Sequence, residues 1–575
     1  MNGSKAGERT WLCWAGLAGI IVLAAALRFA GLRWGLPNEL HSYSYHPDEF
    51  LTIGSSARMA GLLDGHRTID PGLYNYPSLY LYISALAMMV ANGYGWLGNA
   101  ANVYLTARVV TVLMGLGAVG ATYWAGRVMF GSAVGLLAAL VLAIAPLHVQ
   151  HSHFATVDVP STLFVALCLG FSGLILKRGS WRDYILAGVM AGLAGGTKYN
   201  AVLVILAPIA AHFLSSAPSS TLSTVEGRGR LARLWRRLIS GRLWLIPACA
   251  IAAFIISTPG SVLHTNQFLG GIGYEMRHQA AGHGLVFAGT GNGFVYTFTS
   301  SLWYGLGPAL AVSLVIAAIW GLWKRDRAVL ALLAFTVPYY VLISLSEVRF
   351  ARYTLPLYPA AALLVGYLIC DWYGALERWW KPSRLALVSV VIFWGFITLV
   401  YTGMVNSALS APDPRDVAAL WIRESIPNGS SIGFVDYPWY YSPPITDDIG
   451  FGTLPQRQDA AKKAPYNIII FSEFAHAGDW WAQGHRPNWV ILTPEETRDA
   501  ERLQGRIDIP AGDRRAVDRT LEDIRCVRQH YLLGLSGKTP VPGFGNYTWY
   551  LWPYGTLPHD MRYALSSVEI WRLRK

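Results

Sequence analysis

Long apolar runs, most of them close to the length that crosses a bilayer, constrain this sequence more than any other feature. A transmembrane helix needs roughly 20 apolar residues, and such runs recur along residues 1–405. Only 14% of the residues are charged, whereas a soluble chain carries roughly 25%. The expected spans are 11–33, 104–126, 131–150, 159–177, 183–197, 199–215, 243–260, 299–322, 328–346, 354–373 and 385–405. The sequence therefore predicts an α-helical polytopic membrane protein with about eleven transmembrane helices.

The basic residues predict how these spans are oriented across the membrane. Lys and Arg concentrate in cytoplasmic loops, and the most basic loop, 216–242, joins two expected spans. The run 79–97 is almost long enough to cross, but all basic turns fall on the N-terminal side only if it lies along the surface as a juxtamembrane helix. We therefore expect a multi-pass protein of the inner (plasma) membrane, with its N-terminus in the cytoplasm and its C-terminus outside. The first run lacks a small-residue cleavage site, so we expect it to be retained.

The net charge and the cysteines exclude two classes of function. The net charge is +12, but the basic residues flank apolar spans instead of clustering on a soluble face, so nucleic acid is not an expected partner. The 5 cysteines show neither a disulfide framework nor the spacing of a zinc site.

The composition changes near the end of the last expected span. We assign residues 1–405 to a transmembrane domain, in which 34–103 form the first outer loop with its juxtamembrane helices, and 406–575 to a soluble domain at the outer face. That domain is large enough to bury a core, and its patterns predict an α/β or α+β fold. The expected elements are an amphipathic helix at Asp413–Glu424 and strands at Ser431–Val435, Asn467–Phe471, Val490–Leu492, Tyr547–Leu551 and Val568–Leu573.

Two adjacent carboxylates, Asp48 and Glu49, follow the first span in the sequence His-Pro-Asp-Glu-Phe. The plain interpretation is a solvated loop with incidental acids. Some charged and polar residues are not needed to set the predicted topology, and in that topology these residues all lie on the outer side of the membrane. They are the 46–50 motif, the 148–158 turn, the loop 261–298, Lys198, and Glu347, Arg349 and Arg352. This arrangement predicts an active site at the outer face of the membrane.

Asp158 follows a turn that contains His148, His151 and His153. An acid beside Pro160 is also favoured simply as the first residue of a helix. The histidines do not form the i, i+4 pair of a helical metal site, and interfacial histidines also bond to tyrosines and lipid phosphates. Metal binding and ordinary hydrogen bonding therefore both stay open for this turn.

Three basic residues lie on the expected outer side, against the usual bias of basic residues toward the cytoplasm. Lys198 joins two short spans, and Arg349 and Arg352 follow Glu347. A guanidinium fork suits phosphate, and a charged pair at the membrane boundary is a functional candidate. The structural alternative is an ion pair between Glu347 and either arginine that ties helices together.

These motifs together resemble the GT-C glycosyltransferases. The acidic motif of the first outer loop is followed by Tyr76-Pro77 at the start of the surface helix and by Asp158-Val-Pro160. Gly-Thr-Lys-Tyr at 196–199 and Glu-x-Arg-Phe-x-Arg-Tyr at 347–353 are also similar. The resemblance spans about residues 11–405. It is to the branch with dolichyl-phosphate-mannose protein mannosyltransferases, lipid A aminoarabinose transferases and RgtA/B/C/D-like enzymes, of the glycosyltransferase family 39 type.

The resemblance implies inverting transfer of a sugar from a polyprenyl-phosphate carrier to a glycan, lipid or protein acceptor at the outer face. By position, Asp48 would be the catalytic base, Glu49 its neighbour or an acceptor-positioning group, and Asp158 a second acid. The residues that would hold the donor phosphate are Lys198, Arg349 and Arg352. Further candidates for substrate binding are His46, Tyr76, His151, His153 and Glu347. The chemistry agrees, because a hydroxyl nucleophile needs a base and a leaving phosphate needs fixed cations.

Two departures from the family pattern bear on the substrates. The aminoarabinose-transferase pattern has Lys before the Pro of the surface helix, where this chain has Tyr76, so one phosphate ligand is missing or replaced. The loop 261–298 is too short for the sugar-binding modules inserted in protein mannosyltransferases, which favours a cell-envelope glycan or lipid as the acceptor. Members of the superfamily differ in metal use, so no cofactor is predicted with certainty and a divalent cation (Mg²⁺ or Mn²⁺) stays an open question.

A transporter or flippase for a lipid-linked or small polar substrate is the alternative from a different class. Transporters hold charges near the midplane on broken helices, often within internal repeats. Here the charges gather at one face and no repeat is visible. A third interpretation, a non-catalytic assembly protein that uses residues 411–575 for protein contacts, is disfavoured by the intact Asp48-Glu49 pair.

Overall fold

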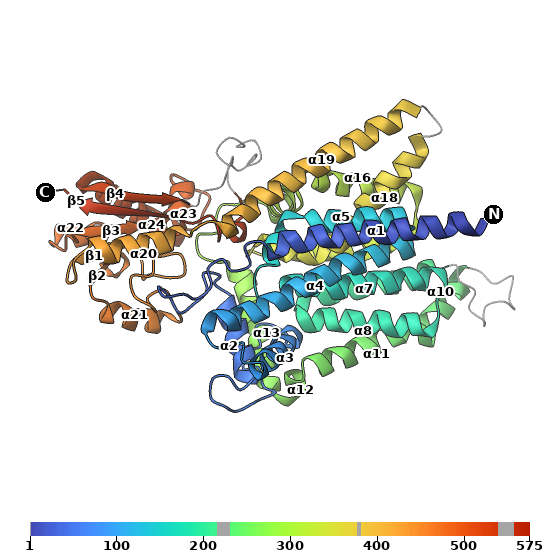
Figure 1. Ribbon diagram of the computed structural model, residues 1–575, viewed down its shortest axis with the longest axis horizontal. Coiled ribbons are helices and arrows are strands. Elements are labelled where there is room, and N and C mark those ends of the chain that lie inside the picture. The colour runs from blue at the N-terminus through green and yellow to red at the C-terminus, as the bar shows by residue number, and fades with distance from the viewer. Residues whose placement is uncertain (1, 216–229, 377–380, 539–556, 575) are drawn as a thin grey trace.

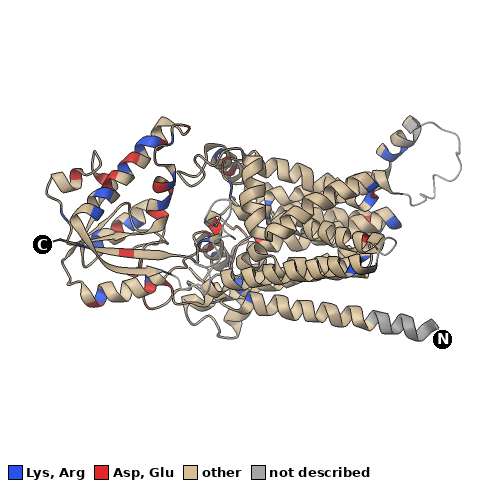
Figure 2. Ribbon diagram, turned by 90° about the horizontal axis from the view of Figure 1, so that it is seen from above, with Lys and Arg blue, Asp and Glu red and all other residues tan. Residues whose placement is uncertain are grey.

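The computed structural model describes residues 2–215, 230–376, 381–538 and 557–574, and it divides into a helical bundle and a smaller domain built on a sheet (Figure 1). The N-terminus and α10 (Arg230–Leu238) lie at one end of the bundle, and the sheet domain lies beyond the other. Charged residues lie mostly in the sheet domain and at the ends of the bundle, whereas the long helices carry few of them along their length (Figure 2). The predicted fold class, a polytopic helical protein with a soluble domain, is confirmed.

The bundle contains long helices and several short ones. They are α1 (Asn2–Phe29), α2 (Glu49–Met59), α3 (Leu79–Gly93), α4 (Ala100–Met129), α5 (Ser132–Ile144), α6 (Pro146–His151), α7 (Asp158–Lys177), α8 (Trp181–Thr197), α9 (Leu206–Leu214), α11 (Gly241–Ser257), α12 (Gly260–Leu263), α13 (Thr265–Ala281), α14 (Gly293–Tyr296), α15 (Trp303–Leu306), α16 (Pro308–Lys324), α17 (Arg327–Ser344), α18 (Tyr358–Leu376) and α19 (Lys381–Ser407). Two 3₁₀ segments, η1 (Tyr199–Ile205) and η3 (Ala351–Leu357), precede α9 and α18. Helices α2, α3 and α13 gather at the end of the bundle nearest the sheet domain (Figure 1).

Seven of the described helical segments are long and apolar enough to cross a membrane, and an eighth results if α14–α15 and α16 form one bent span. The protein is therefore a multi-pass membrane protein. Two expected spans are broken by proline. The run 131–150 ends at Ile144, because Ala145 takes an extended conformation before Pro146. The run 299–322 bends by 119° where Gly307, at φ +93°, precedes Pro308.

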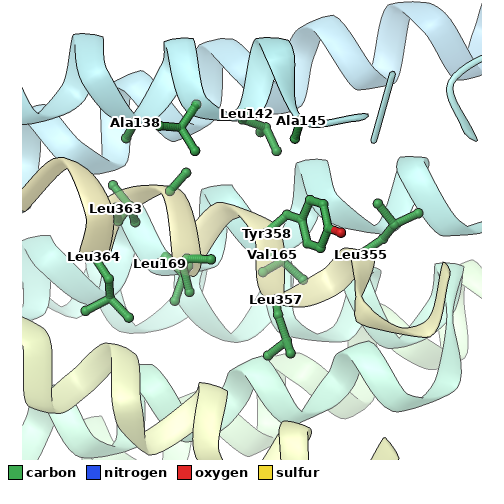
Figure 3. Close-up of a cluster of buried hydrophobic side chains, with 14 of the residues drawn as sticks. Ala138, Leu142, Ala145, Val165, Leu169, Leu355, Leu357, Tyr358, Leu363 and Leu364 are labelled. Atoms are coloured by element: carbon green, nitrogen blue, oxygen red, sulfur yellow. The ribbon is translucent and has the colours of Figure 1, made fainter. Parts of the chain in front are cut away.

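The core of the bundle lies between α4, α5, α7 and α18. Leu142 of α5, Val165 and Leu169 of α7, and Leu363 of α18 interdigitate there (Figure 3). Small residues let the backbones approach, as is usual between membrane helices. A methyl group on Gly135 of α5 would lie 2.6 Å from the carbonyl oxygen of Tyr123 in α4. These contacts hold rigid the helices whose ends carry the charged residues described below.

The smaller domain is a five-stranded mixed sheet with the order β2-β1-β3-β5-β4. Its strands are β1 (Ser431–Phe434), β2 (Asn467–Ile470), β3 (Trp489–Leu492), β4 (Tyr531–Lys538) and β5 (Ser567–Leu573). Its helices are α20 (Pro414–Ser425), α21 (Leu454–Lys463), α22 (Asp479–Ala482), α23 (Pro494–Leu503) and α24 (Ala511–His530). Pairs β1–β2 and β1–β3 are parallel, and β3–β5 and β4–β5 are antiparallel.

Four of the predicted strands and the amphipathic helix form as β1, β2, β3, β5 and α20. The predicted strand Tyr547–Leu551 lies outside the described residues. Strand β4 escaped prediction, because it begins directly after the last residue of α24 and contains two glycines, which weaken the strand pattern.

Candidate active site

A cavity of about 550 Å³ lies between α13, the end of α17, the start of α7 and the turn 75–77. Its lining residues are Asn75, Tyr76, Pro77, Val157, Asp158, Lys198, Tyr199, Asn200, Ile272, Glu275, Met276, Gln279, Ala280, Leu342, Ile343, Leu345, Ser346, Arg352 and Tyr353. Most of this wall is apolar, but it includes two acids and two bases. A mainly apolar cavity with a few converging charges suits an amphiphile that has a charged head group.

Asp48 forms an ion pair with Arg352 beside this cavity. The carboxylate Oδ2 lies 2.9 Å from a guanidinium nitrogen, and about a fifth (21%) of the Asp48 side chain is exposed. Asp48 immediately precedes α2 and makes no side-chain capping bond to that helix, so its carboxylate is free for other partners. Burial raises the pKa of Asp48 and the Arg352 charge opposes this rise. The result is an ionisable carboxylate with a resident counter-ion, suited to accept a proton.

Asp158 forms the second ion pair, with Lys198. The lysine Nζ donates to Oδ1 at 2.5 Å, and both side chains are buried. Asp158 is the first residue of α7, and Lys198 has an extended conformation between α8 and η1. Burial lowers the pKa of Lys198, and the Asp158 carboxylate opposes this shift. The structure therefore brings together Asp48, Asp158, Lys198 and Arg352, four of the residues predicted from sequence.

Glu49 faces away from this group. Its carboxylate accepts from two guanidinium nitrogens of Arg108, at 2.8 and 2.6 Å, and from the Ala155 N–H at 2.7 Å. The hydroxyl of Ser44 also donates to it at 2.5 Å, and the side chains of Glu49 and Arg108 are fully buried. Through these contacts Glu49 joins α2 to α4, and it does not line the cavity. The role predicted for it, as neighbour of the base or acceptor-positioning group, stays a prediction.

The histidines serve mainly as hydrogen-bonding and packing groups. His153 bonds to the backbone carbonyls of Val149 and Ala30, and His148 contacts Arg28. His46 accepts from the Asp48 N–H at 3.3 Å, and burial lowers its pKa. Among the described residues, no group of three His, Cys, Asp or Glu side chains is arranged to hold a metal ion.

Arg349 and Glu347 lie apart from the cavity wall. They form an ion pair at 3.2 Å in which the glutamate is 60% exposed. Arg349 also donates to the Thr290 hydroxyl at 2.8 Å and to the Gly291 carbonyl at 2.7 Å. The structural alternative considered for this pair therefore describes its contacts, and of the two arginines Arg352 is the one that lines the cavity.

Tyr76 and Glu275 add polar groups to the cavity. Tyr76 stands in the wall at the place where the related pattern has Lys. Glu275, on α13, was not singled out from sequence. Burial raises its pKa, and the nearby Asp48 charge adds to the rise. In the sequence, a lone glutamate in a polar segment does not indicate a role; only the fold places its helix beside the cavity.

His151, Asp560 and Tyr563 connect the site to the sheet domain. The Tyr563 hydroxyl lies 3.1 Å from a guanidinium nitrogen of Arg352. The Asp560 carboxylate accepts from the N–H of Arg352 at 2.8 Å, and a ring nitrogen of His151 lies 3.9 Å from it. Sequence reasoning missed Asp560 and Tyr563, because more than two hundred residues separate them from Arg352 and only the folded chain joins them.

Comparison with known proteins identifies the architecture. Residues 77–226 match the family model described as dolichyl-phosphate-mannose-protein mannosyltransferase, and Asp158 and Lys198 lie within this match. The structure of ArnT from Cupriavidus metallidurans in the apo state is similar at a TM-score of 0.51, with 15% identity, over 87% of this chain and 96% of that one. This chain has a GT-C fold. The family model matches one part of the chain and supports the resemblance expected from sequence, and the likeness to ArnT shows the fold.

Two further structures match less closely. ArnT from Cupriavidus metallidurans bound to undecaprenyl phosphate gives a TM-score of 0.47 at 15% identity, covering 84% of this chain and 94% of that chain. The archaeal oligosaccharyltransferase AglB from Archaeoglobus fulgidus, in complex with an inhibitory peptide and a dolichol-phosphate, gives 0.47 at 13% identity, covering 92% and 73%. A search of the curated proteins found no match.

Proposed function

We propose that this protein transfers a sugar from a polyprenyl-phosphate-linked donor to a glycan, lipid or protein acceptor of the cell envelope, with inversion and with Asp48 as the base. One observation carries the proposal. A mainly apolar cavity of about 550 Å³ has Arg352 and Lys198 in its wall, each paired with a carboxylate. The apolar wall suits a polyprenyl chain, and the two cations suit its phosphate.

The proposed reaction is a single displacement at the anomeric carbon. The acceptor oxygen attacks this carbon while its proton passes to the Asp48 carboxylate. The bond between the anomeric carbon and the phosphate oxygen breaks, and its electron pair remains on the leaving phosphate. Arg352 and Lys198 stabilise the charge that develops there. Asp158 acts on Lys198, which it holds in place through their ion pair.

Arg352 links donor binding to the state of the base. In the structure its guanidinium already binds Asp48. A donor phosphate that binds the same guanidinium reduces the positive charge felt by Asp48 and so makes the carboxylate more basic. The proton acceptor is therefore strongest when the donor is present.

The proposed orientation puts the site and the sheet domain outside an inner (plasma) membrane, with the N-terminus in the cytoplasm. The distribution of charge supports it: the N-terminus and the basic helix α10 share one end of the bundle, and α13, which lines the cavity, lies toward the other (Figure 1). Basic residues favour the cytoplasmic side. The lipid-linked donor would then be used at the outer leaflet.

The test is sugar transfer by the purified full chain in detergent, from a panel of polyprenyl-phosphate sugars, with and without EDTA. We expect the wild type to turn over at least one donor and Asp48→Asn to lose turnover. The matched control is Asp459→Asn, which makes the same chemical change at a 60% exposed carboxylate on α21. Equal turnover by wild type and Asp48→Asn would refute the base assignment. Movement of a lipid-linked sugar between the leaflets of proteoliposomes that contain the wild type, without transfer, would favour the flippase instead.

A further inference from the structure

The segment 557–566 leaves the sheet domain and enters the helical bundle before β5 begins. Leu557 and Met561 are 3% and 0% exposed and belong to the main hydrophobic core of the bundle. The backbone carbonyl of Met561 accepts from the side chain of Gln150 at 2.9 Å. The segment is thus anchored inside the membrane domain, although the residues that follow it form a strand of the outer sheet.

Asp560 fixes the backbone that carries Arg352. This carboxylate is fully buried, and its oxygens accept from the N–H of Ala351 at 3.0 Å and from the N–H of Arg352 at 2.8 Å. These N–H groups belong to the first turn of η3, where the helix itself supplies no acceptors. Asp560 therefore caps η3 from a distant part of the chain and sets the position of the Arg352 backbone.

Tyr563 holds the guanidinium group of Arg352. Its hydroxyl lies 3.1 Å from Nη1 of Arg352, while Nη2 of Arg352 lies 2.9 Å from Asp48. Tyr563 is itself held, because its ring packs edge-on against Tyr440 and its carbonyl accepts from Arg415 at 3.3 Å. Arg352 is thus held at its backbone and at both terminal nitrogens, and two of these three restraints come from the segment 557–566.

We infer that Asp560 and Tyr563 are positioning residues that aim Arg352 at Asp48 and at the donor phosphate, so that the segment 557–566 completes the active site. The inference rests on the proposed function and assigns the sheet domain a part in it. An arginine side chain has many rotamers, and a cation stabilises a leaving group only where the charge develops. The domain supplies the contacts that select one rotamer.

The experiment compares Tyr563→Phe with Tyr531→Phe in the full chain. The first removes the hydroxyl that contacts Arg352. The second removes an equally buried hydroxyl bond, 2.9 Å to the Pro487 carbonyl, inside the same domain and away from the cavity. We expect Tyr563→Phe to lower kcat/KM about tenfold, or ~1.4 kcal/mol, and Tyr531→Phe to leave it unchanged. Asp560→Asn replaces one of the two carboxylate oxygens that accept from the N–H groups of Ala351 and Arg352 by an NH₂ donor, and should lower kcat/KM at least as much.

The pH profile separates positioning from a loss of folding. The Arg352 charge opposes the rise in the pKa of Asp48. A loosened Arg352 opposes it less, so the acid limb of kcat/KM should move to higher pH in Tyr563→Phe. Tyr563→Phe should also cause no further loss when Arg352 is already replaced by Lys. An unmoved acid limb, or additive losses in the double variant, would overturn the inference.

Failure of the inference can be distinguished from failure of the proposed function. Binding of polyprenyl phosphate to the wild type is measured separately from turnover, by the shift in thermal unfolding that the lipid produces. If the wild type neither binds this lipid nor transfers sugar, the proposed function fails. If the wild type is active and Tyr563→Phe equals it, the positioning inference alone fails.

Discussion

Glu49→Gln separates the structural role of one acid from the proposed catalytic role of its neighbour, Asp48. The change keeps the shape of the side chain but leaves the buried Arg108 guanidinium without its counter-ion, since Arg108 otherwise bonds only to neutral groups: the carbonyls of Leu32 and Trp34 and the hydroxyl of Ser44. Removing one partner of a buried ion pair costs about 3–5 kcal/mol. We therefore expect Glu49→Gln to destabilise the protein strongly, with little change in the turnover of the molecules that stay folded.

The measurement is the rate of irreversible inactivation of the full chain in detergent at a fixed temperature, because large membrane proteins rarely refold after heating. If about 3 kcal/mol of the lost stability appears as a lower activation free energy of unfolding, the inactivation rate rises roughly 100-fold. The companion variant Glu49→Gln/Arg108→Met removes both charges and should recover much of the lost stability. Asp48→Asn should behave in the opposite way, since its ion pair is partly exposed: stable and inactive.

A stable but inactive Glu49→Gln protein would refute this reasoning. It would mean that Glu49 takes part in the reaction despite its four hydrogen bonds, and that the acceptor approaches from the α2 side. A double variant as unstable as the single one would also count against it, because the loss would then come from packing and not from the uncompensated charge of Arg108.

Two further predictions concern Lys198 and Glu496. Lys198→Met should lower kcat roughly 10²–10³-fold, as removal of one donor to a developing charge does. Adding Asp158→Asn should restore the stability of the wild type without its activity. Burial raises the pKa of Glu496 to about 8, so the folded chain keeps a proton that the unfolded chain releases, and this contribution to stability is lost as pH rises toward 8. Glu496→Gln, which keeps the capping box with Thr493, should flatten the fall in thermal stability between pH 5 and pH 9; an equal fall in both proteins would refute this.

Sequence reasoning found the residues that short motifs place at the ends of helices. Asp158 and Lys198 begin α7 and follow α8, where their positions depend on helix boundaries that proline and glycine mark well. Asp48 was found in the same way. The side chain of its neighbour Glu49 points elsewhere, because consecutive residues at a helix start point about 100° apart. One carboxylate of the pair faces Arg352 and the other faces Arg108.

The two arginines of the 347–353 motif show a second limit of prediction from sequence. A spacing of three residues would put Arg349 and Arg352 on one face of a helix. Phe350 between them is extended, and η3 begins only at Ala351. The side chains therefore diverge, and Arg349 binds the Gly291 region while Arg352 lines the cavity. The start of η3 could not be predicted from the motif, because Asp560, the residue that caps this helix, lies far away in the sequence.

The cost of burying charge explains why the site needs its second domain. An ion pair taken out of water is stable only when its geometry is good and its remaining donors are satisfied. Glu49–Arg108 meets this condition within the bundle and the loops at the end nearest the sheet domain. Asp48–Arg352 does not, because the contacts to Arg352 from Asp560 and Tyr563 lie on the segment that leads into β5. In the proposed reaction a donor phosphate shares Arg352 with Asp48, so that pair has to be well placed and yet open to exchange. The segment 557–566 would meet both needs, because it holds Arg352 at its backbone and at Nη1 while Nη2 pairs with Asp48.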